Sequence, residues 1–525
     1  MSLCGQSWLG WRRGTAAGNS FQATDPAAGL PLEPVFHGAT LAEADAAAEL
    51  AGRASMPYAR LAPVRRAEFL RAAADAIEAL GAPLLERARR ETGLTEARLT
   101  GERARTCAQL RMFAAITAEG SWVDARIDHG DPRRQPPKPD LRSLRAPIGP
   151  VLVFSPANFP LAYSVAGGDT ASALAAGNPV ITVAHYAHPG TAEFVAGAVI
   201  QAAQKTGMPE GVFSMLLASD GSVGERLVRD PRIKAGAFTG SFAGGAALHR
   251  LAQSRPDPIP FFAEMGSLNP VFLFPGALAE RGPALAETLA QSVLLAAGQF
   301  CTSPGLLSVP EGEAGDRWIE LLVRHLAAAP AGVMLHAGIW RNYVRQLDER
   351  ARAPQLQCRL RSGQPEPGRA PAAVFETSAA AFLAHPEWQH EIFGPAFLIV
   401  RYSAPAQLHE IAAALAGSLT AALWAAAAEQ SDIRELAEAL AWRAGRLIYN
   451  GVPTGLEVGP ATVHGGPWPA ASDPRFTSVG GRALERFTRL AAWQDFPDSL
   501  LPEELQEANP RQISRLVDGR CMGGE

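Results

Sequence analysis

The chain has 525 residues, with an apolar fraction of 47% and a charged fraction of 19%, which suits a globular protein with two or three cores. Its net charge of −4 provides no basic excess, which argues against a nucleic-acid partner. The five cysteines show neither metal-ligand spacing nor a disulfide framework, so we expect no metal site and a reduced, cytoplasmic setting. The N-terminus lacks the basic and apolar regions of a signal peptide.

Helices dominate the first part of the chain. Residues 39–121 place apolar and alanine positions regularly among Glu and Arg, which predicts helix. Residues 129–147 change character, because their prolines exclude helix. We expect a loop there that leads to an exposed extended arm.

From residue 149 onward, short apolar runs alternate with helix-like runs. The first four apolar runs predict strands at 151–154, 179–183, 212–217 and 235–238, and residues 163–176 predict a helix. Residues 271–445 alternate in the same way. Successive strand–helix–strand units predict two α/β domains on parallel sheets.

One uncharged segment, residues 411–428, is long enough to raise the question of a membrane span. It is mostly alanine, and Gly417, Ser418 and Thr420 interrupt it. We therefore expect a helix end, a turn and a buried strand at 419–425, and no membrane partner.

Cys301 and Glu264 supply two separate chemical roles. A thiolate can attack a carbonyl, and a carboxylate in apolar surroundings can activate a water. A lone cysteine is more often a small core residue, but the residues around Cys301 (Ala296 to Gly305) are small and helix-breaking and favour an accessible turn. A lone Glu is more often a surface charge, and a lone Asn158 after a strand is more often a turn residue than an oxyanion donor.

Two further stretches have features of a dinucleotide site. The glycine-rich run 238–245 follows a strand and opens a helix, where backbone N–H groups can meet a pyrophosphate. Its spacing is not Gly-x-Gly-x-x-Gly, so by itself it is a weak signal. Glu391 and Phe393 would share one face of an extended segment and could hold a ribose and a flat ring, although a helix end with a turn is the simpler interpretation.

Taken together, these stretches resemble the aldehyde dehydrogenase superfamily over roughly residues 20–500. The matching runs are SPANFPLAYSVAGGDTASALAAG (155–177), FTGS (238–241), the stretch around Glu264, residues 298–305, residues 391–395 and residues 450–480. The last run narrows the resemblance to the branch that oxidises 2-oxoglutarate semialdehyde (2,5-dioxopentanoate), whose near relatives oxidise fatty aldehydes.

The resemblance implies an α/β fold with a modified Rossmann cofactor domain, an α/β catalytic domain and a β oligomerisation arm. The cofactor domain would comprise residues 1–126 and 148–260, and the catalytic domain residues 261–482. The arm would comprise residues 127–147 and 483–500, followed by a C-terminal extension at 501–525. An arm with a free edge strand implies a homodimer or homotetramer.

The resemblance also implies the roles of individual residues. Cys301 would be the nucleophile, Glu264 the general base and Asn158 the oxyanion donor. NADP or NAD would contact Phe154, Ser155, Val183, His185, Gly240, Ser241, Gly245, Glu391 and Phe393. A small aldehyde would meet Tyr163, Gln299, Ser303 and Pro453, a set that contains no arginine for an acidic substrate.

Val183 departs from the family pattern, which places a lysine there to reach the adenosine ribose or its 2′-phosphate. We expect weaker or altered cofactor choice, with His185 as a partial substitute. A fatty-aldehyde enzyme, an enzyme that passes the acyl group to coenzyme A, and an oligomeric homologue that has lost tight cofactor binding remain alternatives. Glu264 argues against the coenzyme A route, because a hydrolytic route is the one that needs a base for water.

Overall fold

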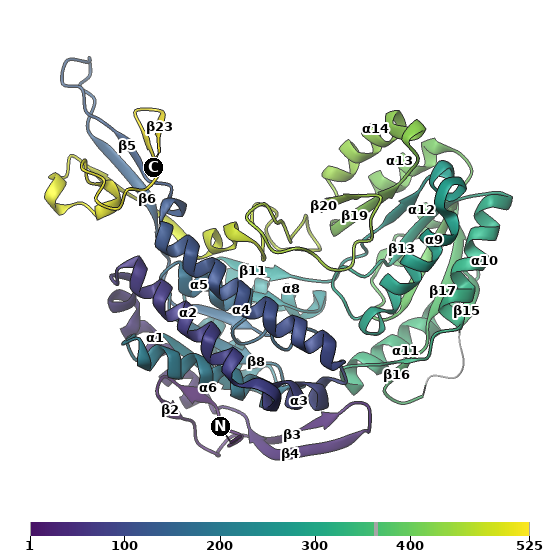
Figure 1. Cartoon of the computed structure of the whole chain (residues 1–525), viewed down its shortest axis with the longest axis horizontal. Coiled ribbons are helices and arrows are strands. Elements are labelled where there is room, and N and C mark those ends of the chain that lie inside the picture. The colour runs from purple at the N-terminus through teal and green to yellow at the C-terminus, as the bar shows by residue number, and fades with distance from the viewer. Residues whose placement is uncertain (1, 362–365, 524–525) are drawn as a thin grey trace.

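The structure, a computed structural model, describes residues 2–361 and 366–523. Two seven-stranded sheets form the bodies of the molecule, and a smaller sheet projects from one of them as an arm (Figure 1). The α/β fold expected from the sequence is confirmed.

The first sheet has the strand order β11-β10-β7-β8-β9-β1-β2. The first five strands in this order are parallel, and β1 runs antiparallel to β9. The strands are β7 (Val151–Phe154), β8 (Val180–Ala184), β9 (Phe213–Leu217), β10 (Ala235–Thr239), β11 (Phe261–Glu264), β1 (Trp8–Leu9) and β2 (Arg12–Arg13). A hairpin of β3 (Ser20–Asp25) and β4 (Leu30–His37) lies near the N-terminus.

Helices cover both faces of this sheet, as the unbroken apolar runs of its strands require. Alternate residues of β7 enter different cores: Val151 and Val153 join one, and Leu152 joins the other. The first core is covered by α2 (Pro63–Ala79), α3 (Gly81–Thr92), α4 (Glu96–Glu119), α5 (Gly168–Ala175) and α6 (Pro189–Lys205). The second is covered by α1 (Leu41–Ala59), α7 (Ser222–Arg229) and α8 (Phe242–Gln253).

The second sheet has the order β15-β17-β18-β13-β12-β19-β20 and is parallel except for β15. Its strands are β12 (Val271–Leu273), β13 (Leu306–Pro310), β15 (Gln357–Arg361), β17 (Ala373–Ser378), β18 (Ala396–Tyr402), β19 (Ser418–Trp424) and β20 (Ala444–Tyr449). The covering helices are α9 (Pro275–Leu294) and α10 (Glu313–Ala327) on one face, and α11 (Ala337–Ala351), α12 (Ala379–Ala384), α13 (Pro405–Ala414) and α14 (Gln430–Ala441) on the other. A small ladder joins β14 (Gly332–Val333) to β16 (Arg369–Ala370).

Three expected boundaries need correction. Strand β11 pairs with β10, so the chain leaves the first sheet after Glu264 and not before Phe261. The arm's sheet has the order β21-β6-β5-β22-β23, so the C-terminal extension contributes two strands to it. The five strands of the arm's sheet are β5 (Arg126–Asp128), β6 (Leu141–Pro147), β21 (Thr488–Gln494), β22 (Arg515–Val517) and β23 (Arg520–Met522).

The third correction concerns the helix expected at 163–176, which begins only at Gly168. A Cβ on Gly167 would lie 2.5 Å from the Ala162 carbonyl oxygen and 2.6 Å from Tyr163 Cα, so the chain folds back on itself there. The N–H groups of Leu161 and Ala162 donate to the Glu102 carboxylate at 2.9 and 3.0 Å. This side-chain anchor on α4 holds the segment as a loop.

The uncharged segment at 411–428 ends α13, turns, and forms the buried strand β19, close to the expected 419–425. None of the helices in the described ranges is both long and apolar enough to cross a bilayer.

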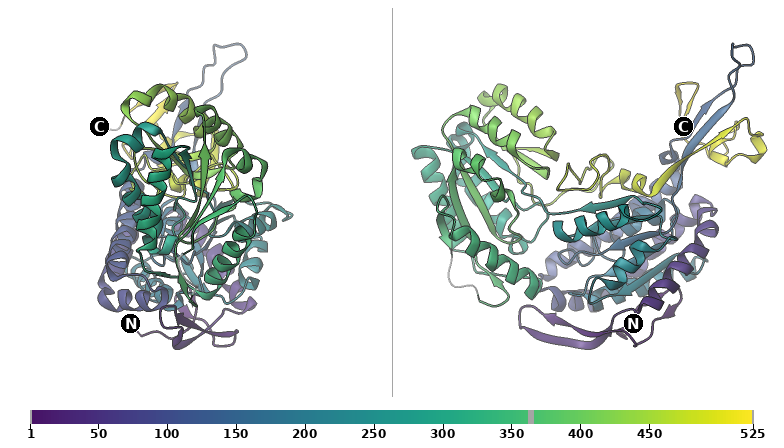
Figure 2. Two further views of the ribbon diagram at one scale, coloured as in Figure 1. Left: turned by 90° about the vertical axis from the view of Figure 1, so that its right-hand side faces the viewer. Right: turned by 180° about the vertical axis from the view of Figure 1, so that it is seen from behind.

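A return segment, residues 450–487, runs from the second sheet back to the first (Figure 2). It is hydrogen-bonded to the end of β11: Met265 N–H donates to the Ala470 carbonyl at 2.8 Å, and Glu264 forms an isolated antiparallel β-bridge with Ala471. This segment and β11 therefore form one unit.

Candidate active site

Cys301 lies in a turn that precedes β13 of the second sheet. The Asn269 amide fixes this turn, since its Nδ2 donates to the carbonyls of Cys301 and Ser303, both at 2.9 Å. Asn269 has a φ of +46° and also accepts from the hydroxyls of Ser267 and Thr420. The half-buried thiol is thereby held at the end of the sheet.

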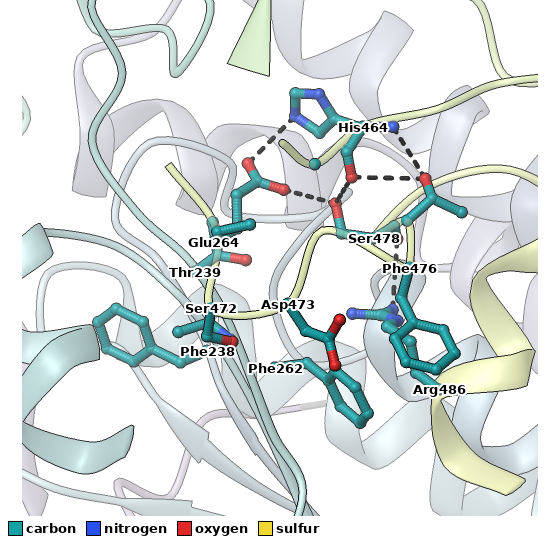
Figure 3. Close-up of a pocket in the computed structure, with 14 residues that line it drawn as sticks. Phe238, Thr239, Phe262, Glu264, His464, Ser472, Asp473, Phe476, Ser478 and Arg486 are labelled. Carbon is teal, nitrogen blue, oxygen red and sulfur yellow. Dashed lines mark hydrogen bonds and ion pairs between the residues drawn. The ribbon is translucent and has the colours of Figure 1, made fainter. Parts of the chain in front are cut away.

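Glu264 reaches the same place from the first sheet. It is the last residue of β11 and is buried. The Ser478 hydroxyl, on the return segment, donates to one of its carboxylate oxygens (Figure 3). The other oxygen faces the imidazole of His464 at 3.1 Å.

His464 connects the two expected catalytic groups. Its Nε2 lies 3.4 Å from Cys301 Sγ and 3.1 Å from Glu264 Oε1. A ring nitrogen of His464, the Cys301 sulfur and a Glu264 carboxylate oxygen all lie within 4.8 Å of one another. Two hydrogen bonds hold the backbone of His464. Its N–H donates to the Thr477 hydroxyl at 2.8 Å, and its carbonyl accepts from Ser478 N–H at 2.7 Å. A single imidazole nitrogen can therefore exchange a proton with the thiol on one side and the carboxylate on the other.

The buried surroundings shift the acidities of these groups. Burial raises the pKa of the Cys301 thiol well above its usual range, and the Glu264 carboxylate raises it further. Burial also acts to raise the pKa of Glu264, but His464 and Ser478 more than offset it, so that this pKa lies below its ordinary value. The resting site therefore has a neutral thiol beside an ionised carboxylate, and the nucleophile needs a proton acceptor.

Asn158 lies beside the same turn. Its Nδ2 donates to the Gln299 carbonyl at 3.0 Å, which places the amide beside the chain two residues before the nucleophile. An amide N–H in this position can be redirected to an oxyanion that forms on the carbonyl carbon attacked by Cys301.

Gln299 does not have the expected place in the substrate funnel. Its side chain is buried, donates to the carbonyls of Ala296 and Val333, and accepts from Leu335 N–H at 3.0 Å. Gln299 thus anchors the turn that carries the thiol. Ser303 stays half-buried in that turn, and Pro453 is buried and accepts a bond from Arg446 through its carbonyl at 2.8 Å.

An aromatic wall borders the thiol. Phe159, Tyr163 and Phe300 pack in one cluster, with ring centroids 5.0 and 5.3 Å apart for the pairs that include Phe159. Two guanidinium groups from α4 lie over these rings: that of Arg98 over Phe159 and Phe300, and that of Arg105 over Tyr163. The residues expected to meet the substrate include no arginine, but the structure places these two arginines beside Tyr163 and its aromatic neighbours.

The edge of the first sheet fits a dinucleotide. Ser241 caps α8 by accepting from Gly244 N–H at 3.3 Å, which leaves backbone donors at an accessible helix N-terminus. A Cβ on Gly245 would lie 2.7 Å from Met265 Cγ, and one on Gly240 would lie 2.7 Å from Phe238 Cζ, so the turn requires glycine at both positions. These donors would hold a pyrophosphate.

Phe154, the last residue of β7, and Ser155, which follows it, differ in what they offer to this edge. Phe154 points its ring into the packing around Phe238, Phe261 and Gly224, so it can contribute only its backbone. Ser155 is buried, and its hydroxyl has no hydrogen-bond partner among the described residues.

The end of β8 offers an apolar side chain where the resemblance places a lysine. Val183 is buried in the apolar core. His185 accepts from Ala187 N–H at 3.1 Å and stacks on Tyr186, while burial together with His188 and His336 lowers its pKa well below the usual range. His185 is therefore neutral near pH 7 and cannot substitute for a lysine charge.

Glu391 and Phe393 are both half-buried but do not share an extended segment, because Phe393 is in a turn. A Cβ on Gly266 would lie 2.5 Å from Glu391 Oε2, so this carboxyl group lies against the link between the sheets. Burial raises the pKa of Glu391 to about 8. A protonated carboxyl in this place can donate as well as accept a hydrogen bond toward a ribose.

Comparisons with known proteins agree with this geometry. The family model described as "Aldehyde dehydrogenase family" matches residues 11–467. The chain belongs to the aldehyde dehydrogenase family. It is an oxidoreductase that acts on aldehydes.

Two relatives of this aldehyde dehydrogenase match it over nearly its whole length. "Alpha-ketoglutaric semialdehyde dehydrogenase 2" of Azospirillum brasilense is 48% identical over 99% of this chain and 100% of its own. "Alpha-ketoglutaric semialdehyde dehydrogenase" of Acinetobacter baylyi is 42% identical over 98% of each chain. The aldehyde dehydrogenase KauB from Pseudomonas aeruginosa, at 22% identity and a TM-score of 0.81 over 94% of this chain and 97% of its own, shares the fold.

Sequence reasoning missed His464 and Asn269 in this aldehyde dehydrogenase. His464 stands in a Gly- and Pro-rich run that served only as part of the resemblance, and no spacing rule relates it to Cys301. The local sequence gives one indication of a special role: His464 stands between an apolar residue and two glycines. Asn269 lies five residues after Glu264, in a stretch that contributes to the resemblance, and no function is expected for it from the sequence.

The negative charge of Glu264 beside the thiol predicts how Cys301 reacts. Because the Glu264 carboxylate disfavours the Cys301 thiolate, Glu264→Gln should lower the pH midpoint for alkylation of Cys301 by iodoacetamide. The rate would be followed by mass spectrometry of the Cys301 peptide, with the exposed Cys358 as an internal control whose midpoint stays unchanged. A midpoint for Cys301 that stays the same or rises would contradict the electrostatic account.

Proposed function

We propose that this protein oxidises 2-oxoglutarate semialdehyde to 2-oxoglutarate through a thioester on Cys301, with NAD or NADP as the hydride acceptor. The observation that carries the proposal is the convergence of Cys301, His464 and Glu264 within 4.8 Å from three distant parts of the chain. The names of the two full-length relatives support the choice of substrate.

The chain's own residues supply the acid–base steps. His464 Nε2 takes the thiol proton as Cys301 Sγ adds to the aldehyde carbon, and the Asn158 amide donates to the oxyanion. When bound, the nicotinamide supplies the acceptor for the hydride. Glu264, ionised and held by Ser478, then removes a proton from the water that hydrolyses the thioester.

The other candidates fit less well. Transfer of the acyl group to coenzyme A needs no base for water, whereas Glu264 lies beside the thiol. A fatty aldehyde needs an apolar tunnel, whereas two arginines flank the aromatic wall. A homologue without catalysis has no use for an ionised carboxylate next to a half-buried thiol.

Five free cysteines support a reducing compartment such as the cytoplasm.

Kinetics of three variants test this proposal. Cys301→Ala should abolish oxidation with the fold retained, and Cys358→Ala, at an exposed cysteine, should stay within about twofold of wild type. Glu264→Gln should release one reduced cofactor per subunit and then stall, with an acyl mass on the Cys301 peptide. The wild type should prefer 2-oxoglutarate semialdehyde to decanal. Steady turnover in Cys301→Ala, or a preference for decanal, would refute the assignment.

For the cofactor, we propose that NAD is preferred to NADP. A 2′-phosphate calls for a cationic or strongly donating partner. The end of β8 offers buried Val183 and a neutral His185, neither of which carries a charge.

Val183→Lys tests this preference. An ammonium at that position should form a charge-assisted hydrogen bond and strengthen NADP binding by about 10- to 100-fold, and NAD binding by less. Fluorescence titration of both cofactors against both proteins measures the effect. If wild type and variant bind NAD and NADP equally well, the charge at this position does not set the preference.

We further propose that two copies of the chain associate through open sheet edges. Strand β21 ends the arm's sheet and β20 ends the second sheet. Both carry exposed apolar side chains, among them Leu490 and Tyr449, and Trp442 lies just before β20. Unpaired edges of this kind normally find a strand partner, and a homodimer that joins β21 to β20 would satisfy both.

Light scattering after size-exclusion chromatography tests the association. Leu490→Lys places a charge on the β21 edge and should shift the protein from a dimer or tetramer toward a monomer. Leu30→Lys, at an exposed leucine on β4, is the matched control and should leave the mass unchanged. A monomeric wild type would contradict the proposal, as would an unchanged mass in Leu490→Lys.

A further inference from the structure

One face of α4 carries a stripe of charge toward the aromatic wall. Arg98, Glu102 and Arg105 are spaced so that they lie on the same side of the helix. Glu102 is buried and fully used, because its Oε1 accepts from the N–H groups of Leu161 and Ala162 and its Oε2 faces Arg98 at 3.2 Å. The one acidic group of the stripe is therefore committed to the fold.

Arg98 is neutralised by this carboxylate. Its guanidinium lies 4.4 Å from the ring centroids of both Phe159 and Phe300, so it is wedged between two aromatic faces. With Glu102 at one end and rings on either side, Arg98 supports the wall beside the nucleophile.

Arg105 has no such counter-charge. Among the described residues, no carboxylate lies within the 4.0 Å of an ion pair with it, and its buried Nε has no hydrogen-bond partner. Its one hydrogen bond runs from Nη2 to the Tyr163 hydroxyl at 3.1 Å, and its guanidinium lies 5.2 Å from the centre of that ring. A half-buried arginine without an anion is unusual, because desolvated charges are normally paired.

The position of Arg105 relates it to the reacting group. The Tyr163 ring, which it contacts, lies 6.2 Å from the His464 ring, and His464 lies 3.4 Å from Cys301 Sγ. The positive charge of Arg105 is also among the influences on the Cys301 thiol, where it acts to lower the pKa. Tyr163 is thus a neighbour of both Arg105 and the imidazole that lies beside the thiol.

A second arginine near Cys301 and Tyr163, Arg446, is already hydrogen-bonded. Arg446 donates through Nη2 to the carbonyls of Pro453 and Gly455, at 2.8 and 2.9 Å.

Burial raises the pKa of Tyr163 well above its usual range, so its hydroxyl stays protonated and can donate. Arg105 and Tyr163 therefore present a cation and a donor side by side.

We propose that Arg105 is a specificity-determining residue that binds the carboxylate at the far end of a short ω-carboxylated aldehyde, with the Tyr163 hydroxyl as a second donor. This inference rests on the proposed function, since it explains how a semialdehyde with an acidic end is chosen. Arg105 takes no part in the bond-making steps. Its contribution is a charge-assisted hydrogen bond made both before and during the reaction, which affects KM more than kcat.

Arg105→Met, which keeps the aliphatic stem and removes the charge, tests this inference. Wild type and variant would be assayed with 2-oxoglutarate semialdehyde, succinate semialdehyde and uncharged pentanal. Loss of one charge-assisted hydrogen bond should lower kcat/KM for the two acidic aldehydes by about 10- to 100-fold, mainly through KM, and leave pentanal within about twofold. Arg105→Lys should recover part of the loss.

Arg103→Met is the matched control, because Arg103 is on the same helix but donates to the Gly81 carbonyl. It should keep the wild-type preference. An equal fall for pentanal and the acidic aldehydes in Arg105→Met would indicate a structural role and overturn the inference, as would an unchanged preference. A wild type that prefers succinate semialdehyde, with that preference lost in Arg105→Met, would refute the proposed substrate and support the role of Arg105.

Discussion

The site depends on burial of an imidazole between a thiol and a carboxylate. In water a thiol, a carboxylate and an imidazole would each be solvated, and their mutual influence would be weak. Here all three lie in one largely desolvated volume, and the His464 nitrogen is within 3.4 Å of the sulfur and 3.1 Å of the carboxylate oxygen. The Glu264 carboxylate therefore acts to raise the pKa of the thiol, and His464 acts to lower the pKa of the carboxylate.

The fold brings these groups together by joining two sheets at their strand ends. Glu264 ends the last strand of the first sheet, and Cys301 precedes β13 of the second sheet. Asn269, in the link between the sheets, fixes the turn of Cys301 through two hydrogen bonds. The return segment then brings His464 and Ser478 back to Glu264. Glu264 matches the rule that ligand sites lie at the carboxyl ends of parallel strands, whereas Cys301 lies at the amino end of β13.

The sequence was informative wherever a strand was buried on both faces. The run 151–154 coincides with β7, since an uninterrupted apolar run has few alternatives in an α/β chain. The helix expected from residue 163 failed, because its first turn was replaced by a loop that Glu102 anchors from α4. Local periodicity carries no information on such long-range side-chain bonds.

The same limit applies to the site. The resemblance named Cys301 and Glu264, which the structure brings together, but the arginines of α4 lie far from Cys301 in the chain, and only packing places them there. The position of Gln299 in the chain predicts a contact with the substrate, whereas its side-chain amide is fully engaged with the backbone. Proximity along the chain does not determine which way a side chain points.

The return segment has a mechanical consequence. Hydrogen bonds between the return segment and β11 hold His464 and Glu264 together, while the sulfur belongs to a turn of the second sheet. The distance from the nucleophile to both proton-handling groups is therefore set by how the two sheets are joined. Thiol activation and thioester hydrolysis depend on that same spacing.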